Sequence, residues 1–292
     1  MNLATELAPL RQRIIDRLEE VLPKSEVAPE HLHAAMRHGA LVPGKCVRGC
    51  LVYASGRALG IEVERLDRFA CALELVHAYS LVHDDLPCMD NDDIRRGRPS
   101  CHAAYGEATA LLAGNALLLC AIAEVSGDRE ASGEQRSASI DRLCQAAGSL
   151  GMVGGQQLDI ELEDAEEHQI DSLNEVYRLK TGCLFHASVM LPTELVQASP
   201  EQRDTLDTYA RKIGLAFQVR DDLEDMEQDA QLAGDGTRPT YPVLLGVEAS
   251  RKKLSDLGTE ALAVLDVFGD QADLLRSLGR WLTSGSADEQ LD

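Results

Sequence analysis

A long apolar helical pattern that ends in a dense group of aspartates is the feature that most constrains this chain. Over residues 66–86 apolar side chains recur at spacings of three and four on most sides of a helix, so this segment is expected in the core. Five aspartates then fall within ten positions: Asp84, Asp85, Asp90, Asp92 and Asp93. Anions at the C-terminal end of a helix are unfavourable by about 0.3–1 kcal/mol each, because the helix dipole is negative there. A bound cation would reverse that cost, which favours a metal site over the alternative of a solvated acidic loop.

Positive charge follows the aspartates immediately. Arg95, Arg96 and Arg98 come next in the sequence. Because carboxylate, water and phosphate oxygens are the ligands that Mg²⁺ prefers, this combination is typical of a site that holds divalent cations and a polyanion together. Pro87 should break the helix and turn the chain back, so that Asp90 can rejoin Asp84.

A second acidic cluster closes another apolar helix. Residues 214–225 read GLAFQVRDDLED, in which Asp221 and Asp225 lie four apart on one helical face and Asp222 lies beside them. Alone, this cluster is equally consistent with a solvated helix end. Two such clusters, each ending a long apolar helix, are more specific, and they predict carboxylates that face each other across a central cavity.

Helical periodicity extends through most of the 292 residues, and no stretch alternates as a strand would. Aromatic residues make up only 4%, so the pattern predicts an all-α fold: a single-domain helical bundle over residues 1–292 around a central cavity. Four glycines within 148–155 are expected to interrupt the helices. The expected helices cover 3–22, 31–38, 47–59, 66–86, 107–125, 137–150, 173–196, 205–227, 241–257, 260–268 and 273–282.

Composition excludes several classes of protein. Lysine and arginine number 28 against 49 acidic residues, a formal net charge of −21, which argues against binding to nucleic acid or to anionic membrane surfaces. The eight cysteines form no CxxC pair and no zinc spacing, which indicates a reducing cytoplasm. The N-terminus predicts a charged amphipathic helix, not a signal peptide. The most apolar stretch, 108–125, contains Asn115 and Glu124, so a buried helix is expected there and not an integral membrane span.

The two acidic clusters resemble the paired aspartate-rich motifs of the trans-prenyl diphosphate synthases. DDLPCMDNDDIRRGRPSCH is similar to the first motif, in the form with four residues between the aspartate pair and the third aspartate, and DDLED is similar to the second. The resemblance extends over nearly the whole chain and is strongest to the bacterial farnesyl diphosphate synthases. Further matching stretches are LVHAYSLVHDD, GGQQLD (154–159), YRLKTG (177–182), GLAFQVRDD and TYPVLLG (240–246).

The resemblance implies the isoprenoid synthase fold and a homodimer. It also implies an enzyme that condenses isopentenyl diphosphate with an allylic diphosphate, with the departed diphosphate as proton acceptor and about three Mg²⁺ ions per site. The implied metal ligands are Asp84, Asp85, Asp90, Asp221, Asp222 and Asp225. The implied contacts to the allylic diphosphate are Arg95, Lys180, Thr181 and Gln218. The implied contacts to isopentenyl diphosphate are Lys45, Arg48, His77 and Arg96.

Single residues in this set have plainer interpretations. His77 alone could be a core histidine, Gln218 a hydrogen-bonding residue between helices, and Lys180 a surface lysine. Tyr79 and Ser80 lie one helical turn before Asp84 and are expected at the cavity floor. A bulky Tyr79 there would stop a growing chain early, which resembles the pattern for a fifteen-carbon product, although core packing is the alternative.

Three departures from the family pattern are evident. Cys46 stands where the family has an arginine, and Pro43 replaces a glycine and removes an N–H, so isopentenyl diphosphate is expected to bind more weakly. The loop after the second motif lacks one lysine, and Arg238 could replace another. The chain also ends in acidic residues. These departures leave two alternatives open: a divergent specialised-metabolism prenyltransferase or terpene cyclase, and a non-catalytic partner subunit.

Overall fold

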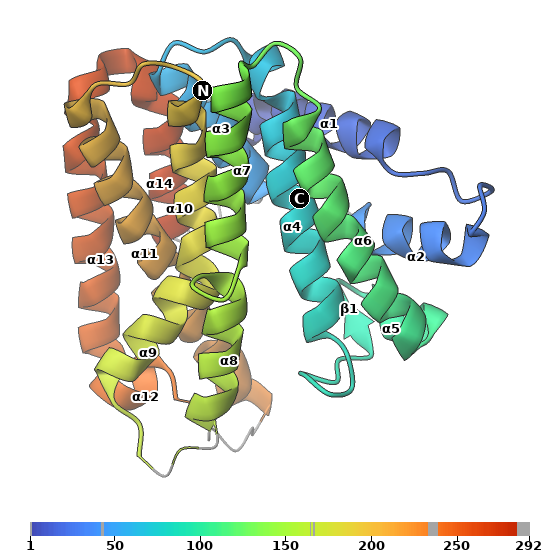
Figure 1. The fold of residues 1–292 in the computed structure, drawn as a ribbon. Helices are drawn as coiled ribbons and strands as arrows, with labels where there is room; N and C mark the ends of the chain where they lie inside the picture. Colours follow the sequence, from blue (N-terminus) through green and yellow to red (C-terminus); the bar gives the residue numbers. More distant parts are fainter. Residues whose placement is uncertain (1, 42–43, 164, 166, 233–238, 285–292) are drawn as a thin grey trace.

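The computed structural model describes residues 2–41, 44–163, 165, 167–232 and 239–284, and these are almost entirely helical (Figure 1). The predicted all-α class is therefore confirmed. The first half of the chain contains α1 (Leu3–Val21), α2 (Glu30–Ala40), α3 (Val47–Ala58), the 3₁₀ helix η1 (Val63–Leu66), α4 (Asp67–Asp84), α5 (Cys101–Tyr105), α6 (Glu107–Ser126) and α7 (Gly133–Ala147). The second half contains α8 (Met152–Glu163), α9 (Ile170–Tyr177), the π-helix η2 (Arg178–Gly182), α10 (Cys183–Met190), η3 (Leu191–Glu194), α11 (Pro200–Leu232), α12 (Tyr241–Leu245), α13 (Val247–Ala263), η4 (Val264–Ala272) and α14 (Asp273–Ser284).

Helix α4 is the central element of the bundle. Ten of its eighteen residues are buried, and it packs against α1, α2, α3 and α6. The approach to α6 is close because the facing residues are small: a Cβ at Gly114 would lie 2.2 Å from Nε2 of His83. The apolar pattern that predicted a core helix is thus matched by its burial.

Helix α6 is long and apolar enough to cross a membrane, by length and composition only. Part of it is core, since Ala113, Leu117 and Ala121 are fully buried beside α4. Leu112 and Leu119 on its outer face are 56% and 66% exposed.

Two elements differ from the predicted ones. A short antiparallel hairpin, β1 (Ile94–Arg95) with β2 (Arg98–Pro99), lies within the first aspartate-rich motif. Its turn residues Arg96 and Gly97 both have positive φ, as tight hairpins require, but strands of two residues are too short to show alternation. The expected glycine interruption is also shorter than predicted, because α8 begins at Met152 and includes two of the four glycines.

The predicted long helices of the second half are divided. The segment 173–196 contains α9, a single π-helical turn and α10, and 241–257 is split at Gly246, whose φ is 84°. A π-turn places one extra residue in the helix, so it rotates the following side chains relative to an uninterrupted α-helix. That rotation falls in the segment that carries Lys180 and Thr181.

Candidate active site

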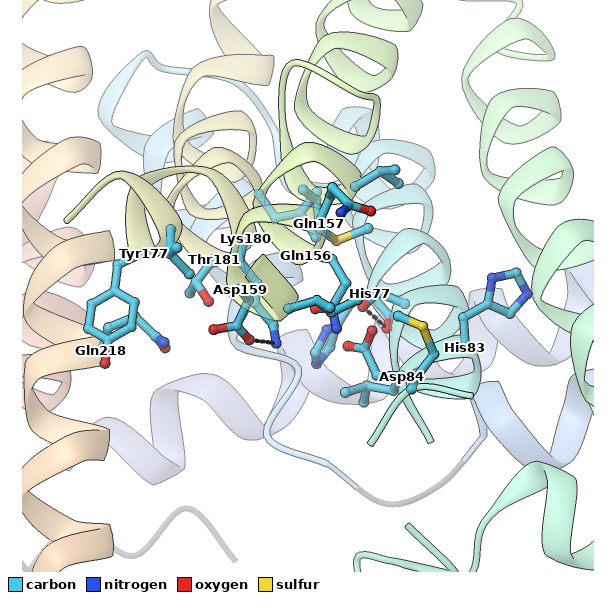
Figure 2. Close-up of a pocket in the computed structure, with 18 of the residues that line it drawn as sticks. His77, His83, Asp84, Gln156, Gln157, Asp159, Tyr177, Lys180, Thr181 and Gln218 are labelled. Atoms are coloured by element: carbon cyan, nitrogen blue, oxygen red, sulfur yellow. Dashed lines mark hydrogen bonds and ion pairs between the residues drawn. The ribbon is translucent and has the colours of Figure 1, made fainter. Parts of the chain in front are cut away.

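A cavity of about 690 Å³ lies between α4, α8, η2 and α11 (Figure 2). Its wall contains five carboxylates: Asp84, Asp159, Asp221, Asp222 and Asp225. It also contains three cationic side chains: Arg48, Arg95 and Lys180. The two acidic clusters therefore do face a shared cavity, as predicted. The prediction that each cluster ends its helix is right for α4 and wrong for α11, which continues beyond Asp225 to Leu232.

The first acidic cluster forms where α4 ends at Asp84. The backbone N–H of Asp90 donates to the carbonyl of Asp84 at 2.9 Å, so the chain reverses after the helix as Pro87 predicted. The pKa of Asp84 is raised to about 6, chiefly by burial; Lys180 opposes the rise and Asp90 adds to it. Asp90 itself is not part of the described cavity wall.

Asp85 is not among the residues that line this cavity. It is 2% exposed, and Nε of Arg95 donates to its Oδ1 at 2.8 Å, with a second short contact from Nη2. The pKa of Asp85 is raised because burial outweighs the hydrogen bonds from Arg95. Arg95 lines the active-site cavity, so the pair fixes a guanidinium at the cavity edge.

The second acidic cluster lies on the opposite wall. Burial raises the pKa of Asp221 to about 7, against the attraction of Arg220. Asp222 is 8% exposed and accepts hydrogen bonds from the hydroxyl of Tyr177 at 2.7 and 2.8 Å and from the backbone N–H of Tyr241 at 2.8 Å. Asp222 therefore connects α9, α11 and the start of α12 in addition to lining the cavity.

Lys180 points into the cavity from η2, where its ammonium forms an ion pair of 2.5 Å with Asp159 of α8 (Figure 2). Gly155 of α8 makes this contact possible. A Cβ at Gly155 would lie 2.1 Å from the backbone N of Lys180, so only glycine lets α8 approach η2 this closely. Thr181 and Gln218 line the same cavity.

Arg48 and His77 form a buried basic end of the cavity. Burial lowers the pKa of Arg48 to about 10, and burial together with Arg48 and Arg96 holds the pKa of His77 well below its ordinary value. Nε of Arg48 is buried and has no hydrogen-bond partner among the described residues. A desolvated arginine with an unsatisfied donor is a favourable place for an anion.

Two further basic residues predicted for the site are not on the described cavity wall. Nζ of Lys45 lies 5.3 Å from the centre of the Trp281 ring. Arg96 lies against the backbone of Gly44, where a Cβ would be 2.4 Å from its Nη1. Arg238 lies outside the described residues.

Tyr79 and Ser80 line the cavity, and their place at its floor stays a prediction. Tyr79 is 7% exposed and its ring meets that of His83 edge-on, with 5.2 Å between the centres. The hydroxyl of Ser80 donates to the carbonyl of His77 at 2.9 Å, so it is engaged within α4.

Sequence reasoning assigned no role to Gln156, Asp159 or Tyr177, although all three line the cavity. Oε1 of Gln156 is buried and has no hydrogen-bond partner within the described part of the chain. The spacing of three between Gln156 and Asp159 places them on one helical face, but the signal was missed because glycines were expected to interrupt this helix.

The donor chemistry of the cavity fits magnesium. Its two acidic walls offer hard carboxylate oxygens, and burial raises the pKa values of Asp84 and Asp221 to about 6 and about 7, as expected where desolvated carboxylates are not fully neutralised. Within the described residues, no three histidine, cysteine or acidic side chains are grouped closely enough to hold one ion by themselves. A metal ion held here would therefore need further oxygen ligands to complete its coordination.

Comparison with known proteins decides the family, because residues 29–261 match the polyprenyl synthetase family. The chain belongs to that family. It is 43% identical to the farnesyl diphosphate synthase of Escherichia coli over 249 residues, which cover 81% of this chain and 82% of that protein. An apo structure described as an FPP/GFPP synthase from Zymomonas mobilis has a TM-score of 0.89 and 37% identity, covering 96% of this chain and 98% of that one. The geranyltransferase structure from Legionella pneumophila has a TM-score of 0.90 and 32% identity over 97% and 98% of the two chains.

As a polyprenyl synthetase family member, the protein is a prenyltransferase. The resemblance inferred from the aspartate-rich motifs is confirmed, and so is the isoprenoid synthase type of fold. Neither alternative, the terpene cyclase or the non-catalytic subunit, is favoured by these relatives.

Proposed function

We propose that this polyprenyl synthetase is a farnesyl diphosphate synthase, which extends dimethylallyl and geranyl diphosphate with isopentenyl diphosphate. The single observation that carries the proposal is the arrangement of the cavity: two acidic walls face each other, with Arg48 and His77 buried at its basic end. The named relatives at 36–43% identity support the same product.

Magnesium is the proposed cofactor, with about three ions per site. When bound, these ions neutralise charge on the departing diphosphate and so favour its release. The proposed ligands are Asp84, Asp85, Asp90, Asp221, Asp222 and Asp225. Asp84 and Asp221 already line the cavity, whereas Asp85 would have to give up its contact with Arg95 to hold a metal ion.

The allylic diphosphate is proposed to lie between η2 and the edge of the hairpin. Lys180, Thr181 and Gln218 line the cavity on one side, and Arg95 lines it on the other. In the Lys180–Asp159 pair the carboxylate orients the ammonium, which can then donate its remaining protons to phosphate oxygens.

Isopentenyl diphosphate is proposed to bind at the basic end. Arg48 supplies a guanidinium fork with an unsatisfied donor, and the low pKa of His77 keeps that imidazole neutral so that it can accept or donate one hydrogen bond. Lys45 and Arg96 complete the proposed set from the segment beside Gly44. Cys46 supplies no charge, so this substrate is expected to show the higher KM of the two.

The proposal extends to chain length, assembly and location. Tyr79 limits the product to fifteen carbons, with Ser80 beside it. The exposed leucines of α6, among them Leu112 and Leu119, support a homodimer, because apolar faces of this kind are typical of subunit interfaces. The soluble enzymes among the relatives support a cytoplasmic protein, not an integral membrane protein.

One assay tests the function directly. Purified protein is incubated with Mg²⁺, isopentenyl diphosphate and either dimethylallyl or geranyl diphosphate, and the products are identified by chromatography. Farnesyl diphosphate from both allylic substrates is the expected result. Release of diphosphate without elongation would instead indicate a cyclase, and absence of turnover that is restored by a second synthase would indicate a partner subunit.

A further inference from the structure

A second cavity, of about 470 Å³, shares the π-helix η2 with the active-site cavity. Lys180 and Thr181 line the active-site cavity, whereas Arg178 and Gly182 line the second one. The described wall of the second cavity carries no aspartate or glutamate, although the protein has a net charge of −21. Its cationic side chains come from α7, η2, α11 and α13: Arg142, Arg178, Arg211 and Lys253.

The three arginines are held in the same way. Arg142 donates through Nε and Nη2 to Glu194, Arg178 through Nε and Nη2 to Glu175, and Arg211 through Nε and Nη2 to Asp207. Each carboxylate thus binds the side edge of its guanidinium and lies outside the cavity wall. The Nη1 group of each of these arginines makes no hydrogen bond to any described residue, so the outer edge of the fork remains available to a ligand.

The rest of the wall is partly apolar. Ala146, Ala187 and Leu215 lie among the cations, and Leu150 at the rim is 85% exposed. A ligand that satisfies both parts has an anionic head and a hydrocarbon chain.

We propose that this basic cavity is a second binding site, which takes a phosphate monoester with a short hydrocarbon chain. Phosphate fits better than carboxylate because it offers three acceptor oxygens and a charge near −2, whereas a carboxylate is satisfied by a single guanidinium fork. Since Arg178 lies two residues from Lys180, the bound head group contacts the segment that also forms the active-site wall. The inference does not depend on the proposed function, because it is tested by binding without turnover.

Calorimetric titration of the full chain with octyl phosphate in EDTA tests the site. One site per chain is expected to saturate. Without Mg²⁺ the five carboxylates of the active-site cavity disfavour an anion beside them, but its Arg48 end can attract one, so the variants below decide which cavity is filled. Octanoate, octanol and inorganic phosphate are each expected to bind at least tenfold more weakly. If octanol bound as tightly as octyl phosphate, the proposal of an anion site would be overturned. If octanoate bound as tightly, the proposed preference for phosphate would be overturned.

The double substitution R178M/R211M is designed to remove the site without unfolding the protein. Both side chains are more than half exposed, and each pairs only with a carboxylate three or four residues before it, so thermal melting should be nearly unchanged. Octyl phosphate should bind at least tenfold more weakly to this variant and normally to R129M, an exposed arginine in the α6–α7 connection. R178K/R211K keeps the charge without the fork and should bind with an intermediate loss.

A second comparison locates the ligand. D221N removes one carboxylate from the active-site wall, so an anion bound in that cavity would bind more tightly to this variant. Unchanged binding to D221N, together with the loss in R178M/R211M, supports the basic cavity. Tighter binding to D221N, or wild-type binding to R178M/R211M, overturns the proposal.

Discussion

The two cavities that share η2 arrange the same residue types in opposite ways. In the active-site cavity five carboxylates, among them Asp84, Asp221 and Asp222, line the wall beside three cationic side chains. In the basic cavity the guanidinium groups form the wall, and carboxylates such as Glu175 and Asp207 lie behind them. Acidic walls need an added cation before they can hold a diphosphate, whereas guanidinium walls can bind an anion directly. Whether an anionic ligand needs a metal ion therefore depends on which groups line the wall, carboxylates or guanidinium groups.

Loss of a wall carboxylate should have the largest effect. Asp221→Asn is expected to lower kcat by about 10³-fold or more, since metal-assisted departure of diphosphate contributes several kcal/mol to catalysis. Steady-state kinetics over a range of Mg²⁺ concentrations would measure it. Glu224→Gln is the matched control, because Glu224 is nearby on α11 but not on the described wall; equal losses in both variants would contradict the role of the wall.

Substitutions in the Lys180–Asp159 pair should have the next largest effect on activity. Lys180→Met is expected to raise KM for the allylic diphosphate by about 10–100-fold, because it removes one charge-assisted contact of roughly 1.5–3 kcal/mol. Asp159→Asn retains the ammonium but not its orientation and should show a smaller rise. A larger change in KM for isopentenyl diphosphate than for the allylic substrate would place Lys180 at the wrong end of the cavity.

The three hydrogen bonds that Asp222 accepts should contribute to the stability of the fold. Tyr177→Phe removes the donor to both carboxylate oxygens and should lower the free energy of unfolding by about 1–3 kcal/mol, because it leaves buried acceptors less satisfied. Chemical denaturation measures this change. Phenylalanine keeps the stacked contact with Tyr241, whose ring centre is 6.0 Å away, so an unchanged stability would show that the hydrogen bonds contribute little.

Tyr79 should change the product more than the rate. Tyr79→Ala opens the cavity floor and is expected to yield products longer than fifteen carbons, with kcat within about tenfold of the parent. Chromatography of the dephosphorylated products measures chain length. Ser80→Ala is the control, because its hydroxyl bonds within α4; unchanged products from Tyr79→Ala would show that another residue forms the floor.

Much of the active site could be predicted from sequence because its signals are local. The apolar period placed α4 in the core, Pro87 predicted the chain reversal that brings Asp90 back to Asp84, and the spacing of four placed Asp221 and Asp225 on one face. The assignment of Asp85, Asp90 and the other residues as ligands stays a prediction, as does the single domain over residues 1–292. The same local reasoning did not predict the hairpin or α8, since two-residue strands and glycine-rich helices have no clear period.

The sequence by itself determined the all-α class, the two acidic clusters on long helices and the family. Only the tertiary structure decided which charges line a wall and which support it from behind. Asp85 turns toward Arg95, Asp159 meets Lys180 across the close approach of Gly155, and Arg178 lies on a different cavity from Lys180. The physical reason is that helix formation depends on neighbours three and four residues away, whereas the partner of a charge depends on which helices pack together.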